Sequence, residues 1–384
     1  MVSDIFLGWA LLRRERIRFL VAILGVSFAV ALILMQIGFR EAMFDSGVRL
    51  HRHWVYDLVL VSPETVSVIG SKSFTSRRLY QALAAAGVAS VHTVYLQHGL
   101  WKDISTGDTR DLFVVGFDPA RSVFDLPEVE DQLNTLKLED FVLFDSRARP
   151  EFGPVADRLA AQGEHLVEIN GHKAVVRGLF PLGPSFGING TVIAGVDNFL
   201  RIFPGRSRGA IDIGLIRLFD GADAEAVKNL LNSYLQKDVK VLDRDEFIRK
   251  EVDYWASNTP IGYVFGFGIL IGVVVGSIIV YQILFANVAD HLAEYATLKA
   301  MGYSNFFLGL VVIQQAVILA VLGFVPGYLL SIYLYQVASD ALMIELAMNV
   351  QRALLVLVVT IGMCVFSALL AQRKLRAADP AAMF

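Results

Sequence analysis

The chain has 384 residues, of which 55% are hydrophobic and 18% are charged, and its formal net charge is −3. This composition is too apolar for a protein that is soluble throughout and too charged for one that lies in lipid throughout. Part of the chain must therefore lie in a membrane and part in water.

Four apolar runs without Asp, Glu, Lys, Arg or His are long enough to cross a bilayer, which needs about 20 helical residues. They are residues 19–38, 261–286, 306–338 and 353–371. The first is too long for the apolar core of a cleaved signal peptide, and no small-x-small cleavage site follows it, so we interpret it as an anchor. We interpret the third as one helix that bends at Pro326.

Basic residues at the ends of these runs indicate the orientation, because cytoplasmic flanks carry most of the Lys and Arg. They precede the first run at Arg13, Arg14, Arg16 and Arg18 and follow the last at Arg373, Lys374 and Arg376. We therefore expect both termini in the cytoplasm. The predicted segments are an amphipathic arm (1–18), transmembrane helices (19–38, 259–286, 306–338, 353–371), an extracytoplasmic domain (39–258), a cytoplasmic coupling loop (287–305), a short periplasmic loop (339–352) and a cytoplasmic tail (372–384).

The external segment carries 25 Lys and Arg against 30 Asp and Glu without a basic stripe, which argues against nucleic acid as a partner. The one cysteine, Cys364, lies in the fourth run, so no disulfide is expected outside. Periodicity predicts strands at 56–61, 90–96, 111–117, 211–218 and 239–242 and helices at 76–86, 223–234 and 243–255. Asn170-Gly171 predicts a hairpin within a β-rich insertion at 165–194. We expect a mixed α/β domain whose first and last parts pair.

No motif for catalysis is present: the chain has no G-x-x-x-x-G-K-[ST] loop, no G-x-S-x-G elbow and no H-E-x-x-H. His51 and His53 lack a third metal ligand, and we interpret them as polar residues at the membrane interface. His291 and Glu294 fit a solvated helix face. We therefore predict no catalytic residue, no cofactor, no metal and no enzymatic activity.

Glycines at four-residue spacing mark the second apolar run. One set is Gly262 and Gly266, and the other is Gly268, Gly272 and Gly276. Such spacing places each set on one helix face, where another backbone can approach closely. The alternative is that glycine is simply common in membrane helices. We favour a packing face formed by the set of three.

The inner segment at residues 290–301 has no helix breaker and ends at Gly302, which predicts a short amphipathic helix. A plain connector between helices needs only about 2–8 residues, so a structured helix suggests a docking surface. The candidate docking residues are Leu292, Glu294, Tyr295, Leu298, Lys299, Met301 and Gly302.

The string EYATLKAMGYS in this segment resembles the cytoplasmic loop of the FtsX and MacB superfamily of ABC permeases, and the tail RKLRAADPAAMF resembles that superfamily's C-terminus. Other strings, among them QIGFREAMFDSGVRLH and YWASNTPIGYVF, are similar to the DevC branch over nearly the whole chain. The resemblance implies a MacB/FtsX-like fold: an α-helical membrane protein with four transmembrane helices plus a mixed α/β extracytoplasmic domain.

The same resemblance implies a homodimeric half-permease of the inner membrane that works by mechanotransmission. It implies that the ABC ATPase is a separate chain, since only 18 residues precede the first helix. This ATPase would dock on the seven candidate residues. The external domain would engage a periplasmic membrane-fusion adaptor that leads to an outer-membrane TolC-like channel. The implied cargo is a glycolipid or another amphiphile.

Two other functions remain open at this point. One is an FtsX-like regulator that activates an external cell-wall hydrolase by the same motion. The other is a receptor with an external sensor domain, which is disfavoured because the sequence offers no cytoplasmic signalling domain. The partner recovered with the protein would separate them: an adaptor and channel for export, or a hydrolase for regulation.

Overall fold

The computed structural model describes residues 16–377, so most of the predicted arm and the end of the predicted tail lie outside the described residues. The chain forms two compact units. One consists of Met1–Ala42 with Pro260–Phe384, and the other is Met43–Thr259. We call them the membrane unit and the external domain.

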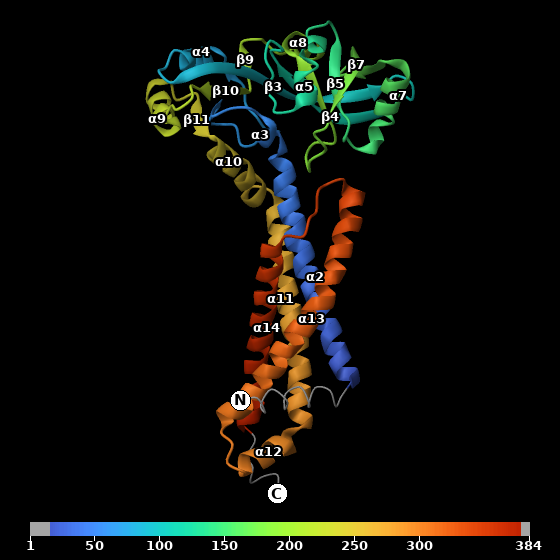
Figure 1. The fold of residues 1–384 in the computed structure, drawn as a ribbon, viewed down its shortest axis with the longest axis vertical. Coiled ribbons are helices and arrows are strands. Elements are labelled where there is room, and N and C mark those ends of the chain that lie inside the picture. The colour runs from blue at the N-terminus through green and yellow to red at the C-terminus, as the bar shows by residue number, and fades with distance from the viewer. Residues whose placement is uncertain (1–15, 378–384) are drawn as a thin grey trace. The chain divides into compact units, whose positions relative to one another are not determined.

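Four helices of the described chain are long and apolar enough to cross a membrane (Figure 1). They are α2 (Arg16–Gly47), α11 (Pro260–Asp290), α13 (Asn305–Leu342) and α14 (Val350–Ala377). The helix α2 continues well past the predicted end of its apolar run at residue 38, and α13 continues through Pro326. The expected four apolar helices are therefore present.

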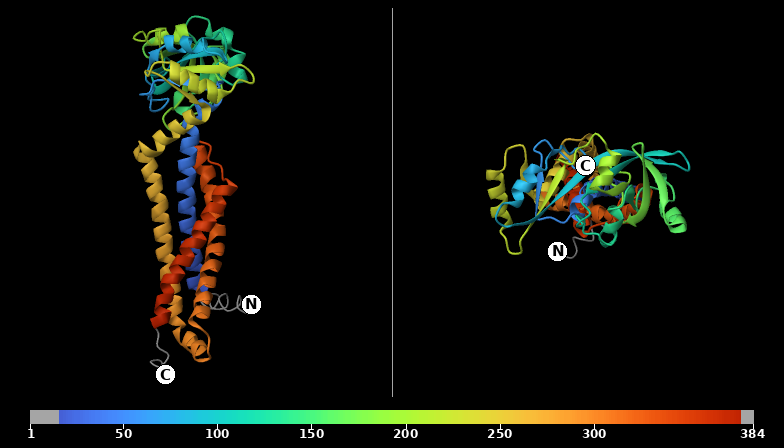
Figure 2. Two further views of the ribbon diagram at one scale, coloured as in Figure 1. Left: turned by 90° about the vertical axis from the view of Figure 1, so that its left-hand side faces the viewer. Right: turned by 90° about the horizontal axis from the view of Figure 1, so that it is seen from above.

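Small residues and hydroxyl groups bring the membrane helices together. A Cβ atom added to Gly323 of α13 would lie 2.5 Å from Val26 Cβ of α2. Ser27 Oγ donates to the Gly323 carbonyl at 2.9 Å, and Ser367 Oγ of α14 donates to the Ser277 carbonyl of α11 at 2.8 Å. The helices α11, α13 and α14 lie side by side in Figures 1 and 2. Close backbone approach and side-chain bonds to carbonyls are typical of helix packing in lipid.

The external domain is built on one sheet of nine strands in the order β11-β1-β10-β3-β4-β8-β5-β7-β6. The strands are β1 (Leu58–Val61), β3 (Val88–Asp103), β4 (Thr109–Phe117), β5 (Phe141–Asp145), β6 (His165–Ile169), β7 (His172–Phe180), β8 (Thr191–Gly195), β10 (Ile213–Leu218) and β11 (Lys240–Asp243). A second, two-stranded sheet joins β2 (Phe74–Thr75) and β9 (Ala210–Ile211). The pairs β4–β8 and β5–β7 are parallel, and the other pairs are antiparallel.

The helices of this domain are mostly short. They are α3 (Arg49–His53), α4 (Arg77–Leu83), α5 (Pro127–Glu130), α6 (Leu133–Leu136), the 3-10 turn Pro150–Phe152, α7 (Val155–Gln162), α8 (Val196–Ile202), α9 (Ala224–Tyr234) and α10 (Arg244–Ser257). The predicted helices at 76–86, 223–234 and 243–255 correspond to α4, α9 and α10. The mixed α/β class of the domain is therefore confirmed.

The long strand β3 serves two parts of the sheet. Its first half pairs with β10, and its second half pairs with β4. Its end also pairs with β6, where Trp101 lies opposite Ile169, so β3, β4, β8, β5, β7 and β6 close into a ring. Closure leaves no free edge within the ring. The predicted insertion at 165–194 is thus part of the same sheet.

The first and last parts of the domain pair as expected, because β1 lies between β10 and β11. The Asn170-Gly171 hairpin is also confirmed, with φ of 53° and 82° at its two turn residues. Positive φ at both positions is the reason for this residue pair. The predicted strand at 90–96 is too short, since β3 continues to Asp103.

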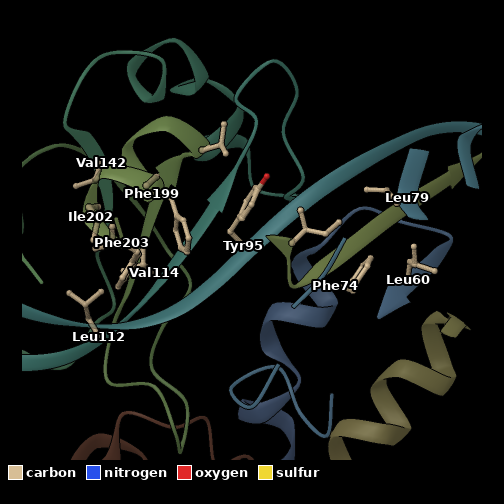
Figure 3. Packing of buried hydrophobic residues seen from close by; sticks show 14 of the residues in the cluster. Leu60, Phe74, Leu79, Tyr95, Leu112, Val114, Val142, Phe199, Ile202 and Phe203 are labelled. Atoms are coloured by element: carbon tan, nitrogen blue, oxygen red, sulfur yellow. The ribbon is translucent and has the colours of Figure 1, made fainter. Parts of the chain in front are cut away.

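Large aromatic side chains fill the core on both sides of β3. Trp101 packs on Phe144 and Phe152, with ring centroids 4.9 and 5.8 Å apart. Figure 3 shows Leu79 at one end of the cluster and Phe199 toward the other, with Tyr95 of β3 between them. The same buried cluster therefore joins the ring to the rest of the sheet.

Candidate functional site

The predicted docking segment contains a short helix, α12 (Leu292–Ala300), in the membrane unit. The preceding helix α11 runs to Asp290, beyond the predicted end of its apolar run, and His291 separates the two helices. Asp290 accepts a hydrogen bond from the Arg18 guanidinium of α2. The start of the segment is thereby connected to the first membrane helix.

The end of α12 is a Schellman motif, a left-handed helix stop closed by two backbone bonds. The Gly302 N–H donates to the Lys299 carbonyl at 3.0 Å, and the Tyr303 N–H donates to the Leu298 carbonyl at 3.1 Å. Gly302 has φ +97°, which L side chains rarely adopt. The prediction that Gly302 ends this helix is confirmed. Ser304 Oγ then accepts from the Phe307 N–H and begins α13.

The apolar side of α12 packs against the chain's own helices. Tyr295 is buried, and Leu292 and Leu298 are half-buried against the core of the membrane unit. Burial raises the pKa of the Tyr295 phenol to about 12. A polar contact of its hydroxyl with the side chain of buried Gln315 on α13 offsets part of that rise. Apolar packing of Leu292 and Leu298, together with the polar contact of Tyr295, holds this side.

The opposite side of α12 is exposed. Glu294 and Gly302 are exposed, Met301 is 65% exposed, and Lys299 is half-buried. Glu294 lies 3.2 Å from His291 Nδ1. His291 itself is buried, so the prediction of a solvated face is wrong for this residue. The seven candidate residues are thus divided between an inward side and an outward side.

The three glycines of the predicted packing face lie against α2 of the same chain. A Cβ atom on Gly268, Gly272 or Gly276 would lie within 2.8 Å of a side-chain atom of α2. The nearest atoms belong to Gln36, Ile33 and Ala29. Gly266 has nothing within 4 Å of the corresponding position. The set of three therefore faces a neighbour that Gly266 lacks.

A buried pair of titratable groups lies in the external domain, between α3 and α10. His51 is fully buried and packs on Phe247 at 4.4 Å, so its interpretation as an interfacial residue is wrong. Its Nε2 atom lies 3.6 Å from Glu251 Oε2. Glu251 also accepts from the Val68 N–H at 2.7 Å and from Trp255 Nε1 at 2.9 Å.

Burial disfavours the charged form of both groups. It lowers the pKa of His51 to about 3, with a smaller contribution from Arg52, and raises the pKa of Glu251 to about 7. The imidazole is therefore neutral at neutral pH, and the carboxyl is partly protonated. This pair joins the segment that follows α2 to the helix that precedes α11.

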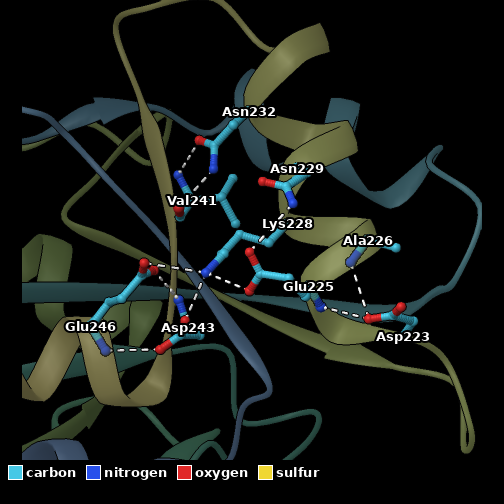
Figure 4. A network of polar contacts seen from close by, with 9 residues as sticks. All are labelled: Asp223, Glu225, Ala226, Lys228, Asn229, Asn232, Val241, Asp243 and Glu246. Carbon is cyan, nitrogen blue, oxygen red and sulfur yellow. Dashed lines mark hydrogen bonds and ion pairs between the residues drawn. The ribbon is translucent and has the colours of Figure 1, made fainter.

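A second polar cluster fixes the start of α10 (Figure 4). Lys228 Nζ of α9 lies 2.8 Å from Asp243 and from Glu225 and 3.2 Å from Glu246. Hydrogen bonds to Asp243 and Glu225 raise the pKa of this lysine. Asp243 and Glu246 also form a capping box, which begins α10. Among the described residues, no three His, Cys, Asp or Glu side chains gather as metal ligands.

Comparisons with known proteins give a family match for one part of the chain. Residues 266–380 match the family of the FtsX-like permease C-terminal domain. No curated protein matches the chain. The periplasmic region of MacB from Actinobacillus actinomycetemcomitans is similar at 12% identity over 50% of this chain and 91% of that chain, with a TM-score of 0.34.

The extracellular domain of the noncanonic ABC-type transporter YknZ from Gram-positive bacteria is similar at 13% identity, over 49% of this chain and 99% of that chain, with a TM-score of 0.33. The family match covers α12, α13, α14 and most of α11. The last three membrane helices, with the short helix between them, are thus similar in sequence to an FtsX-like permease domain.

Proposed function

We propose that the chain is the membrane permease of an ABC exporter of the DevC branch in the MacB/FtsX superfamily. The observation that carries this proposal is the FtsX-like permease match, which includes α12 and all seven candidate docking residues. In this proposal, the chain forms a homodimer in the inner membrane with both termini in the cytoplasm. A separate ABC ATPase supplies the energy, and the chain hydrolyses no ATP.

The two sides of α12 have different roles in this mechanism. The outward side, with Glu294, Lys299, Met301 and Gly302, meets the ATPase. The inward side, with Leu292, Tyr295 and Leu298, passes the displacement to the membrane helices through its packing.

The membrane helices then move the external domain, which works a periplasmic adaptor and, through it, an outer-membrane TolC-like channel. The absence of charged residues from the four apolar runs supports this route, because ionisable groups inside a membrane usually mark a polar pathway. The cargo need not pass between the helices. A glycolipid or another amphiphile fits the DevC resemblance.

Substitutions on the two sides of α12 test the proposal. Met301→Asp should weaken ATPase binding about tenfold or more, since burying a Met contributes about 1.5–3 kcal/mol. Leu298→Asp should leave the subunits bound but remove transport-linked ATPase stimulation. Glu294→Ala should be mild, because an exposed ion pair contributes about 0–1 kcal/mol. The measurements are ATPase pull-down and ATP turnover of the complex in nanodiscs.

Unchanged assembly and transport in both Met301→Asp and Leu298→Asp would show that α12 is only a connector. A pull-down of the full chain from its own membranes tests the remaining partners. Recovery of an adaptor and channel supports export, whereas recovery of a peptidoglycan hydrolase supports the FtsX-like regulator.

A further inference from the structure

An open pocket of about 780 Å³ lies along α10 in the external domain, and the proposed transmission of motion does not use it. Three basic residues line it: Lys240 on β11 and Arg249 and Lys250 on α10. None of these cations forms an ion pair within residues 16–377, whereas nearby Lys228 contacts three carboxylates. The pocket therefore holds three cations that form no ion pair with a described side chain.

Lys250 is the most constrained of the three. It is half-buried, and burial together with the neighbouring Lys240 charge lowers the pKa of its ammonium group. Charges of one sign in a partly desolvated position repel each other, and an anion between them would remove that repulsion. The arrangement suits an anionic ligand.

Two acidic residues also line the pocket, and they do not cancel its charge. Glu246 is already engaged, because its side chain contacts Lys228 at 3.2 Å and accepts from the Asp243 N–H at 3.1 Å. Asp253 is the remaining acid, and it is exposed. Three cations against these two carboxylates leave the lining with a formal excess of one positive charge.

The pocket has an apolar part beside its charges. Val66 is 44% exposed, and Leu242 and Tyr254 lie in the same lining. The lining continues to Asn258, two residues before the apolar helix α11 begins at Pro260. Two residues span at most about 7 Å, so by chain connectivity the pocket ends close to where a membrane-spanning helix starts. A ligand with a charged and an apolar part fits this position.

We propose that this pocket binds the anionic headgroup of a membrane amphiphile. A phosphate or carboxylate lies among Lys240, Arg249 and Lys250, and the adjoining apolar part of the ligand lies on Val66 and Tyr254. This inference adds the chemical class of the cargo to the proposed function. It rests on that proposal only for the direction of transport. Binding itself needs no ATPase.

The test is calorimetric titration of the full chain in a non-ionic detergent with three probes. They are dihexanoyl phosphatidylglycerol, dihexanoyl phosphatidylcholine and glycerol phosphate. Phosphatidylglycerol should bind at least tenfold more tightly than the other two, and its affinity should fall as salt is raised. The double variant Arg249→Gln/Lys250→Gln should lose at least tenfold. The control Arg77→Gln, at an exposed cation of α4, should change nothing.

Each alternative result overturns a stated part of the proposal. Equal affinity for both lipids removes the charge selectivity, and glycerol phosphate binding as tightly as phosphatidylglycerol reduces the pocket to a simple anion site. Full affinity in the double variant places the ligand elsewhere. If that variant does not fold, Lys240→Gln on an exposed strand position should still weaken binding about threefold. A failure of ATPase docking on α12 would leave all these results unchanged.

Discussion

The membrane unit and the external domain are stabilised differently, the first by close packing at small side chains and the second by burial of large ones. In the membrane unit, helices approach where side chains are smallest, as at Gly323 and Gly272. In the external domain, the largest side chains fill the interior, as Trp101 does inside the ring. Lipid provides no hydrophobic drive between helices, so close packing must hold them, whereas in water the burial of large apolar groups contributes most. The first unit should be sensitive to added volume and the second to removed volume.

The largest effect is expected for Trp101→Ala, which removes volume from the external domain. Trp101 is 1% exposed and packs on two phenylalanines. The change should destabilise the domain by about 3–5 kcal/mol. Hydrogen exchange of the full chain, followed by mass spectrometry, should show lost protection in β3 to β8 and none in α13 or α14. Equal loss in both units would mean that they unfold together, which would contradict the different stabilisation of the two units.

Gly272→Leu adds volume to the membrane unit and is the reciprocal experiment. The new side chain meets Ile33 and Leu32 of α2, and overpacking of this kind costs about 1–3 kcal/mol. Exchange should increase in α2 and α11. Gly266→Leu is the matched control, since the corresponding space is open, and it should have little effect. If the two variants behave alike, the glycine face does not determine helix packing.

The buried pair His51 and Glu251 should determine how the stability of the external domain responds to pH. Between about pH 4.5 and 6.5, the folded domain holds one proton on Glu251, and the unfolded chain holds one on His51. Both states then bind the same number of protons, so stability should be nearly constant across this window.

Removing either partner should reveal a slope of about 1.4 kcal/mol per pH unit. In His51→Phe, Glu251 binds a proton more tightly in the folded state, so stability should decrease as pH rises from about 4.5 to 7. In Glu251→Gln, His51 resists protonation in the folded state, so stability should decrease as pH falls below 6.5. Thermal unfolding followed by tryptophan fluorescence measures both. Slopes of the same sign in the two variants would contradict the assignment.

The smallest effect is expected for Ser27→Ala. Its Oγ lies 2.9 Å from the Gly323 carbonyl oxygen and 2.6 Å from the Ile23 carbonyl oxygen, so these two acceptors share its one hydrogen. A hydrogen bond between membrane helices contributes only about 0.6 kcal/mol on average. Exchange in α13 should change slightly, and much less than with Gly272→Leu. A larger loss for Ser27→Ala would show that hydroxyl bonds, and not close packing, hold this unit.

Features of the fold that depend on neighbouring residues are predicted better from the sequence than features that depend on long-range contacts. The α12 stop follows from Gly302 alone, and the hairpin follows from Asn170-Gly171. The interpretation of His51 as an interfacial residue is wrong because Phe247, which packs on it, lies almost 200 residues further along the chain. The predicted strand ends before β3 does because apolar alternation stops at Gln97 and His98, although pairing with β4 keeps the backbone extended there.

The same limit applies to the candidate site. Periodicity identified the apolar positions of α12 but not what they contact. Leu292 and Leu298 pack against the chain's own helices, and only the tertiary structure separates them from the exposed Met301. An amphipathic pattern gives a helix two faces without saying which face meets a partner.

The position of β1 in the sheet has a consequence for biogenesis. Both neighbours of β1, the strands β10 and β11, are synthesised roughly 150 residues or more after it. Until they emerge, β1 exposes two unpaired edges and an apolar sequence, which is a template for wrong pairing. Non-local pairing of this kind is also slow. The external domain should therefore complete its sheet only when the chain has been synthesised almost to α11, and until then β1 is exposed to wrong pairing.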